Sequence, residues 1–186
     1  MDDFDTSTYS TLMPITSSYG HDDRLDRFRR IRAAIILSRC PEGFRLSIER
    51  CAKDGVGLAV RWPQVRRYLK SALRPHALLQ WEDQYSAVVR PIELLLPANC
   101  LTEVIAQLLL KLAEWPLTPR LLLTALPITT KERLRWTKDG RLKQTGNVTI
   151  NRGQLISVPT YSVSLVERLL NDPAIIGKWR AQDAQM

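Results

Sequence analysis

The stretch that decides the fold is residues 118–142, which read TPRLLLTALPITTKERLRWTKDGRL. It opens with Thr118, a good helix N-cap, followed by Pro119, which suits the first helical position. Pro127 cannot lie in a helix interior, so this first helix must be short. The sequence therefore predicts a brief apolar helix that ends in a tight turn.

A second helix start follows the turn at once. Thr129 and Glu132 have the spacing of a capping box, in which each side chain accepts a hydrogen bond from the backbone amide of the other residue. The helix is predicted to run to about Lys138, because Gly140 can take the left-handed conformation that commonly ends helices. The segment thus predicts two short helices joined by a tight turn.

Cations gather on this second helix and just beyond it. The positive end of the helix dipole and these cations both suit a DNA backbone or groove. Arg133 or Arg135 can make a bidentate contact with guanine N7 and O6. The residues predicted to contact DNA in this segment are Thr130, Lys131, Arg133, Arg135, Lys138, Arg141 and Lys143.

Residues 147–160 have the pattern of a β-hairpin. Val148 and Ile150 alternate with Thr149, residues 151–154 form the turn, and Arg152 lies at its tip. A basic tip after a recognition helix can reach the sugar-phosphate backbone or the minor groove as a wing. Taken alone, the hairpin is equally explained as a small cover over the core; the basic helix before it favours a wing, with Arg152 as a further DNA contact.

Residues 117–170 resemble the winged helix-turn-helix of the excisionase and MerR-like group. The matching motifs occur in the family's order: Thr118-Pro119, Ile128-Thr129, Trp136, Gly140-Arg141-Leu142 and Tyr161-Ser162. The chain departs from the family pattern where a turn glycine is replaced by Pro127, apolar residues by Arg133 and Thr137, and a proline by Lys143. The resemblance implies a protein that binds duplex DNA without catalysis.

The rest of the chain is predicted to be largely helical. The predicted helices cover residues 22–38, 44–53, 64–73, 76–89, 100–114, 164–171 and 174–181, and residues 56–60 are predicted to be extended. Residues 92–96 are either a strand or a buried link. The fold class that follows is mainly α, with a helical N-terminal part and a C-terminal winged helix-turn-helix that carries a small β-hairpin. Pro91 and Pro97 suggest a boundary, so we expect an acidic tail at 1–21, a helical domain at 22–95 and a winged domain at 96–186.

Two further groups of cations stand out in the N-terminal half. A possible secondary patch consists of Arg61, Arg66, Arg67, Lys70 and Arg74, with Trp62 and Tyr68 beside it. Anchoring in the core explains these aromatic residues more simply than base stacking does. The first predicted helix carries five arginines, which form either a solvated face or a phosphate-contacting face: Arg24, Arg27, Arg29, Arg30 and Arg32.

Composition narrows the function classes. The 186 residues include 27 Lys and Arg against 19 Asp and Glu, a formal net charge of +8, and 45% are hydrophobic. This charge favours polyanionic partners, and the apolar content is enough for a folded core. The N-terminal residues lack a signal-peptide pattern and no apolar run approaches a membrane span, so we expect a cytoplasmic, nucleoid-associated protein.

Catalytic and metal-binding motifs are not found. The three cysteines lack C-x-x-C spacing, only two histidines are present, and the nucleophile-elbow, P-loop, zinc-protease and dinucleotide motifs are absent. We therefore expect no enzyme, no cofactor and no metal. The expected function is that of a transcription regulator or an excisionase-like DNA-architecture factor. The alternatives left open are a protein-interaction adaptor of a plasmid or phage system, RNA binding, and association with a second copy or another protein.

Overall fold

The chain divides into two units that are described separately here. The computed structural model describes residues 21–53, 55–92, 97–151 and 153–185. The division falls between Glu114 and Trp115, whereas the sequence predicts a boundary between residues 95 and 96. The helix before this point, α5 (Ala98–Glu114), belongs to the N-terminal unit, because it packs against three other helices of that unit.

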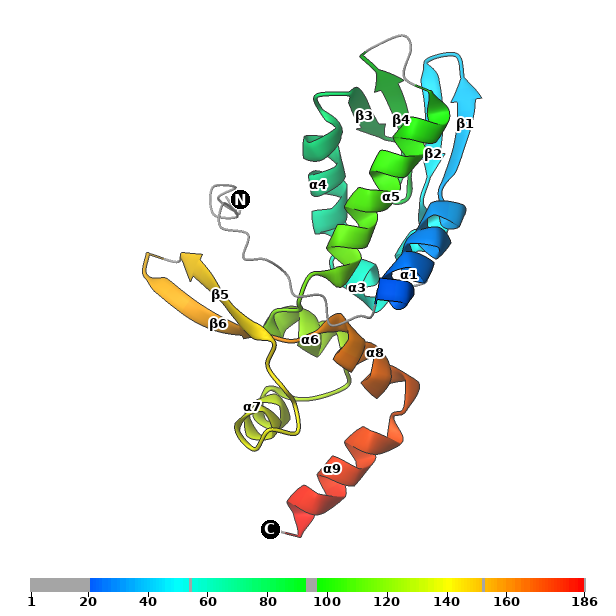
Figure 1. Cartoon of the computed structure of the whole chain (residues 1–186). Helices are drawn as coiled ribbons and strands as arrows, with labels where there is room; N and C mark the ends of the chain where they lie inside the picture. Colours follow the sequence, from blue (N-terminus) through cyan, green and yellow to red (C-terminus); the bar gives the residue numbers. More distant parts are fainter. Residues whose placement is uncertain (1–20, 54, 93–96, 152, 186) are drawn as a thin grey trace. The chain divides into compact units, whose positions relative to one another are not determined.

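The N-terminal unit contains a four-stranded antiparallel sheet in the order β1-β2-β4-β3 (Figure 1). The strands are β1 (Ile36–Cys40), β2 (Gly43–Ser47), β3 (Ala77–Trp81) and β4 (Ser86–Pro91). Leu46 lies opposite Ala87 and Leu79 opposite Val89, and all four are buried. These residues define the inner face of the sheet, since side chains alternate between the two faces of a strand.

The helices of this unit are α1 (His21–Ala34), α2 (Glu49–Lys53), α3 (Val56–Ala59), α4 (Trp62–Leu73) and α5. The α5 helix contacts α1, α3 and α4, and α4 also packs beside β3. Gly57 of α3 allows the closest approach, because an added Cβ would lie 2.3 Å from the carbonyl oxygen of Ala113. Only glycine fits there without a backbone shift.

The predicted mainly α fold class is wrong, since this unit is mixed α/β. Residues 76–89, predicted as one helix, form the β3–β4 hairpin instead. Ala77 and Leu79 are buried while Leu78 and Gln80 are exposed, which is the alternation of a strand with one covered face. The Asp83 carboxylate accepts hydrogen bonds from the amides of Tyr85 and Ser86 and so closes the turn.

Three shorter assignments in the same half were also wrong. The end of the first predicted helix is strand β1, residues 43–47 are strand β2 rather than the start of a helix, and residues 56–59 are helical rather than extended. Cys40 pairs with Gly43, so a two-residue turn joins the first two strands. Gly43 has φ of +137°, and its Cα hydrogens face the carbonyl oxygen of Val89. β2 also pairs with β4, which is distant in sequence, and so joins the β1–β2 hairpin to the rest of the sheet.

The C-terminal unit consists of α6 (Pro119–Ala125), α7 (Thr130–Lys138), β5 (Gly146–Asn151), β6 (Leu155–Thr160), α8 (Val163–Asn171) and α9 (Ala174–Ala184). Each of these elements was predicted close to its observed position. The unit is built mainly from helices, however, and β5 and β6 form a two-stranded sheet of their own. The expectation of a winged domain with only a small hairpin is therefore wrong as a description of this unit.

The core of the C-terminal unit is centred on two large side chains. Trp136 and Tyr161 are both fully buried, together with Leu122 and Val166. Tyr161 also exchanges backbone hydrogen bonds with Leu117, at 2.7 and 2.9 Å, which joins the start of the unit to the end of its hairpin. None of the helices in the described ranges combines the length and apolarity that crossing a membrane requires.

Candidate nucleic-acid interface

The α7 helix begins with the capping box that its sequence predicts. The Thr129 hydroxyl accepts from the Glu132 amide at 3.2 Å, and the Glu132 carboxylate accepts from the Thr129 amide at 2.7 Å. The buried ring of Trp136 fixes which side of the helix faces inward. Gly140, with φ of +84°, follows its C-terminal end. Local sequence signals thus set both ends of the helix, and packing sets its rotation.

Arg133 does not face solvent, contrary to its predicted role as a groove contact. Its side chain is buried, with 9% of the residue exposed, and Nη1 donates to the Tyr161 hydroxyl at 3.1 Å. The Thr137 hydroxyl lies 3.0 Å from the same Tyr161 oxygen. Arg133 therefore belongs to the interior of the unit, at a position where the resembled family has an apolar residue.

Asp183 of α9 forms ion pairs with two arginines that were predicted to contact DNA. Its carboxylate lies 3.0 Å from Nη1 of Arg135 and 2.6 Å from Nη2 of Arg141, and it also accepts from the indole N–H of Trp136 at 2.9 Å. Arg141 bonds Asp139 as well, and only 17% of its side chain is exposed. Hydrogen bonds from Arg141 lower the pKa of both Asp139 and Asp183 and raise its own pKa. Arg141 therefore has a structural role, whereas Arg135 remains largely exposed.

A second ion pair joins α9 to the start of α7. Nε of Arg180 lies 2.6 Å from Oε1 of Glu132, and Nη2 of Arg180 donates to the Pro127 carbonyl at 2.7 Å. The hydrogen bond from Arg180 lowers the pKa of Glu132 to about 2. The rings of Trp136 and Trp179 meet edge to face, with centroids 4.9 Å apart. One side of α7 is thus covered by α9.

The outward face of α7 carries four predicted contacts that remain accessible, with Leu134 among them: Thr130, Lys131, Arg135 and Lys138. Their spacing of one, three and four residues places them on one side of a helix. None of them is acidic, and Leu134 is 54% exposed between the cations. Within the described part of the chain, no carboxylate lies within ion-pairing distance of Lys131, Lys138 or the exposed Lys143 that follows the helix.

The hairpin was predicted to present a basic tip, but its described surface is largely apolar. Arg152, predicted at its tip, lies outside the described residues. Among the hairpin residues whose side chains the structure describes, the exposed apolar ones are Val148, Ile156 and Leu155, the last being 76% exposed. The alternating pattern of the sequence predicts these residues as strand formers and does not indicate a contact surface. Their exposure is decided by what packs on the hairpin, which the alternating pattern does not reveal.

The predicted secondary patch is partly dispersed. Arg61 is buried, with 2% exposed, and its Nη1 donates to the Leu112 carbonyl at 2.8 Å. The guanidinium of Arg66 lies over the Trp81 ring, 4.8 Å from its centroid. Trp62 is buried and donates to the Gln84 carbonyl, which agrees with core anchoring. The remaining members of the patch are exposed: Arg67, Lys70 and Arg74.

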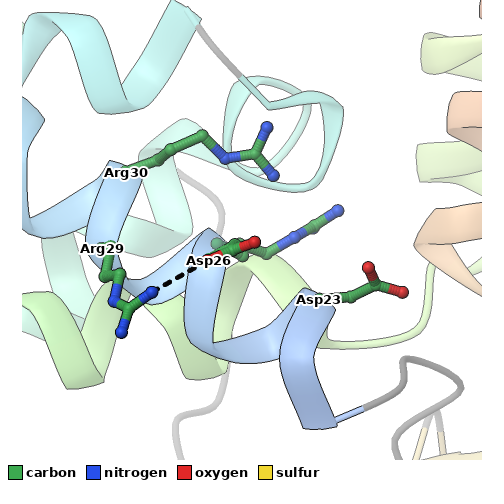
Figure 2. A pocket seen from close by; sticks show the side chains of 5 residues that line it. Asp23, Asp26, Arg29 and Arg30 are labelled. Atoms are coloured by element: carbon green, nitrogen blue, oxygen red, sulfur yellow. Dashed lines mark hydrogen bonds and ion pairs between the residues drawn. The ribbon is translucent and has the colours of Figure 1, made fainter.

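The arginines of α1 lie among acidic groups (Figure 2). Arg24 pairs with Glu114, Arg29 with Asp26, and Arg32 with Glu103, at 3.0 to 3.3 Å. A surface hollow beside this helix is lined by both signs of charge: Asp23, Asp26, Arg27, Arg29 and Arg30. This mixture favours a solvated face over a phosphate-contacting one.

The described residues contain no group of three His, Cys, Asp or Glu side chains placed to hold a metal ion. Cys40, Cys51 and Cys100 lie on three different elements. Comparisons with models of protein families, with curated proteins and with solved structures found no match to this chain. The function must therefore be inferred from the outward faces of the chain's own helices.

Proposed function

We propose that the protein binds duplex DNA without catalysis, through the outward face of α7, as a transcription regulator or a DNA-architecture factor of the nucleoid. The observation that carries the proposal is the acid-free face of Thr130, Lys131, Leu134, Arg135 and Lys138 on the second of two short helices. Helix α6 ends at Ala125 and α7 begins at Thr130, a connection as short as those of helix-turn-helix proteins. The resemblance to the excisionase and MerR-like group supports this proposal and stays a prediction.

The contacts divide by chemistry. Lys131, Lys138 and Lys143 suit phosphates, because each ammonium is a flexible point charge. Arg135 suits a base edge, since its planar guanidinium can contact guanine at two atoms. Its bond to Asp183 involves one terminal nitrogen and holds the side chain at the edge of the helix. Arg133 and Arg141, both engaged inside the unit, are left out of the proposed interface.

A salt titration of DNA binding tests the proposal. The full chain is added to a labelled random-sequence duplex, and affinity is measured by fluorescence anisotropy at rising salt. For the Lys131→Ala/Lys138→Ala double variant, we expect the slope of log affinity against log salt to fall by about 1.8, or about 0.9 per lost phosphate contact. The matched control is Arg168→Ala/Lys178→Ala, which removes the same charge from exposed positions on α8 and α9. If the salt slope falls equally in the two double variants, net charge alone explains the effect. That result would contradict the assignment of the α7 face as the DNA contact.

A selection from random duplexes then tests sequence reading by Arg135. We expect the wild-type chain to enrich sites with a preferred guanine and Arg135→Ala to lose that preference, at a cost of about 1–3 kcal/mol on the selected site. Loss of the same size on random duplexes would show that Arg135 contacts phosphates only.

The exposed apolar side chains of the hairpin favour a second candidate, an adaptor that uses this unit to bind another protein. Val148, Leu155 and Ile156 are the relevant residues, because protein interfaces bury such side chains. Absence of DNA binding even at low salt would support this candidate and reject the first.

A further inference from the structure

Helix α4 presents a straight row of cations on its outer side. Arg67, Lys70 and Arg74 are exposed and are separated by three and four residues, so they share one face of the helix. Val65, Leu69 and Leu73 are fully buried on the opposite side, which holds the row in its outward position. With a rise of 1.5 Å per residue, the row extends over about 10 Å.

No acidic residue interrupts this part of the chain. Residues 55–81 contain no Asp or Glu. The next two acids are already engaged, since Glu82 pairs with Arg45 at 3.3 Å and Asp83 accepts two backbone amides. Among the described residues, no carboxylate lies within ion-pairing distance of the row. Three arginines of α1, by contrast, are paired with Asp26, Glu103 and Glu114.

The surroundings of the row suit phosphates better than bases. The Trp81 ring is covered by Arg66, and Trp62 is buried with its indole N–H bonded to a carbonyl. Neither ring is therefore open to stack on a base, which binding of single strands commonly requires. A length of about 10 Å corresponds to about three nucleotides along one strand of a duplex, which rises 3.4 Å per nucleotide.

We propose that Arg67, Lys70 and Arg74 form a second DNA-binding site, on the N-terminal unit, that holds the phosphate backbone of a duplex without reading its sequence. This site lies on a different unit from α7 and does not depend on the function proposed for α7. The protein would then have two DNA contacts of different kinds, one able to read bases and one purely electrostatic.

The test compares two triple variants of the full chain. Arg67→Ala/Lys70→Ala/Arg74→Ala removes the row, and Arg39→Ala/Arg50→Ala/Arg90→Ala removes the same charge from exposed positions elsewhere on the same unit. On a random-sequence duplex, we expect the row variant to lower the salt slope by about 2.7, or about 0.9 for each of three contacts, and the control to change it little. Melting temperatures and circular dichroism spectra of both variants should match the wild type, because all six substituted side chains are exposed.

Equal effects of the two triple variants would overturn the proposal, as would an unchanged slope for the row variant. Replacing the duplex by polyglutamate separates a DNA site from an acidic-peptide site. Loss of polyglutamate binding with intact duplex binding would also overturn it.

The two proposals are separated by measuring the row variant, the Lys131→Ala/Lys138→Ala variant of α7 and their combination side by side. A row variant that loses DNA affinity when the α7 variant does not would support the α4 site and reject the α7 site. The reverse result would reject the α4 site alone.

Discussion

The cations of the α7–α9 junction and those of α4 are used in opposite ways. At the junction, Arg141 and Arg180 are bonded to carboxylates, and Arg133 donates to the Tyr161 hydroxyl. On α4, Arg67, Lys70 and Arg74 extend into solvent. Both segments are rich in positive charge in the sequence, yet one uses most of it to join helices and the other leaves it available.

Net charge is therefore a poor guide to the position of a binding surface. What matters is whether acceptors from other elements reach each guanidinium. Asp183 and Glu132 provide such acceptors at the junction, whereas Glu82, the first acid after α4 in the sequence, is paired with Arg45. On α7, the exposed cations that no carboxylate of the described residues reaches are lysines, namely Lys131 and Lys138.

The largest effect expected at the junction is that of Trp136→Ala. The ring is fully buried, contacts Trp179 and donates to Asp183, so its removal leaves a cavity and takes one hydrogen bond from the Asp183 carboxylate. We expect a loss of about 3–5 kcal/mol in the free energy of unfolding, measured by chemical denaturation. Leu134→Ala, on the outward face of the same helix, is the control and should change it by less than about 0.5 kcal/mol. Similar losses in the two variants would mean that α7 is rotated from the orientation described.

Tyr161→Phe tests the internal use of Arg133 more finely. The substitution keeps the ring but removes the oxygen that accepts from Arg133 and bonds Thr137. We expect a loss of about 1–3 kcal/mol in unfolding free energy, because a buried guanidinium is left with an unpaired donor. Adding Arg133→Met should restore part of that stability, since both polar partners are then replaced. A Tyr161→Phe variant as stable as the wild type would show that Arg133 is not held by this bond.

The smallest expected effect is a dependence of stability on acid. The hydrogen bond from Arg180 lowers the pKa of Glu132 from its ordinary value of 4.5 to about 2. A lowered pKa in the folded state stabilises the fold above the unfolded value, and this contribution is lost as pH falls from about 4.5 toward 2. Denaturation followed by Trp fluorescence across this range should show a decline that is shallower in Glu132→Gln. Glu42→Gln, which replaces an exposed carboxyl in the other unit, should leave the decline unchanged. If Glu42→Gln makes the decline as shallow as Glu132→Gln does, the effect cannot be assigned to Glu132.

Prediction from sequence succeeded where strong local signals mark the ends of elements. Pro119 in the first turn, the Thr129–Glu132 capping box and Gly140 each act through the local backbone, so α6 and α7 were placed correctly, although Thr118 makes no side-chain cap. The β3–β4 hairpin was mistaken for a helix because adjacent Leu78 and Leu79 fit either period. Only the sheet decides that Leu79 is buried and Leu78 exposed.

The candidate site shows the same limit. The sequence identified α7 as a basic helix and α4 as a basic helix, and both are observed. It did not identify which cations are accessible, because those decisions involve residues far along the chain, such as Leu112 for Arg61 and Tyr161 for Arg133. The exposed apolar side chains of the hairpin were missed for the same reason.

The order of amino acids alone determines the helix caps, the tight turn before α7, the excess of positive charge and the lack of acids around α4. These properties depend on neighbours in sequence or on composition. Tertiary packing decides the sheet, the boundary at Trp115 and the inward turn of Arg133. It does so because a buried polar group is stable only beside a partner, and here the partners lie tens of residues away in sequence and are brought near by the fold.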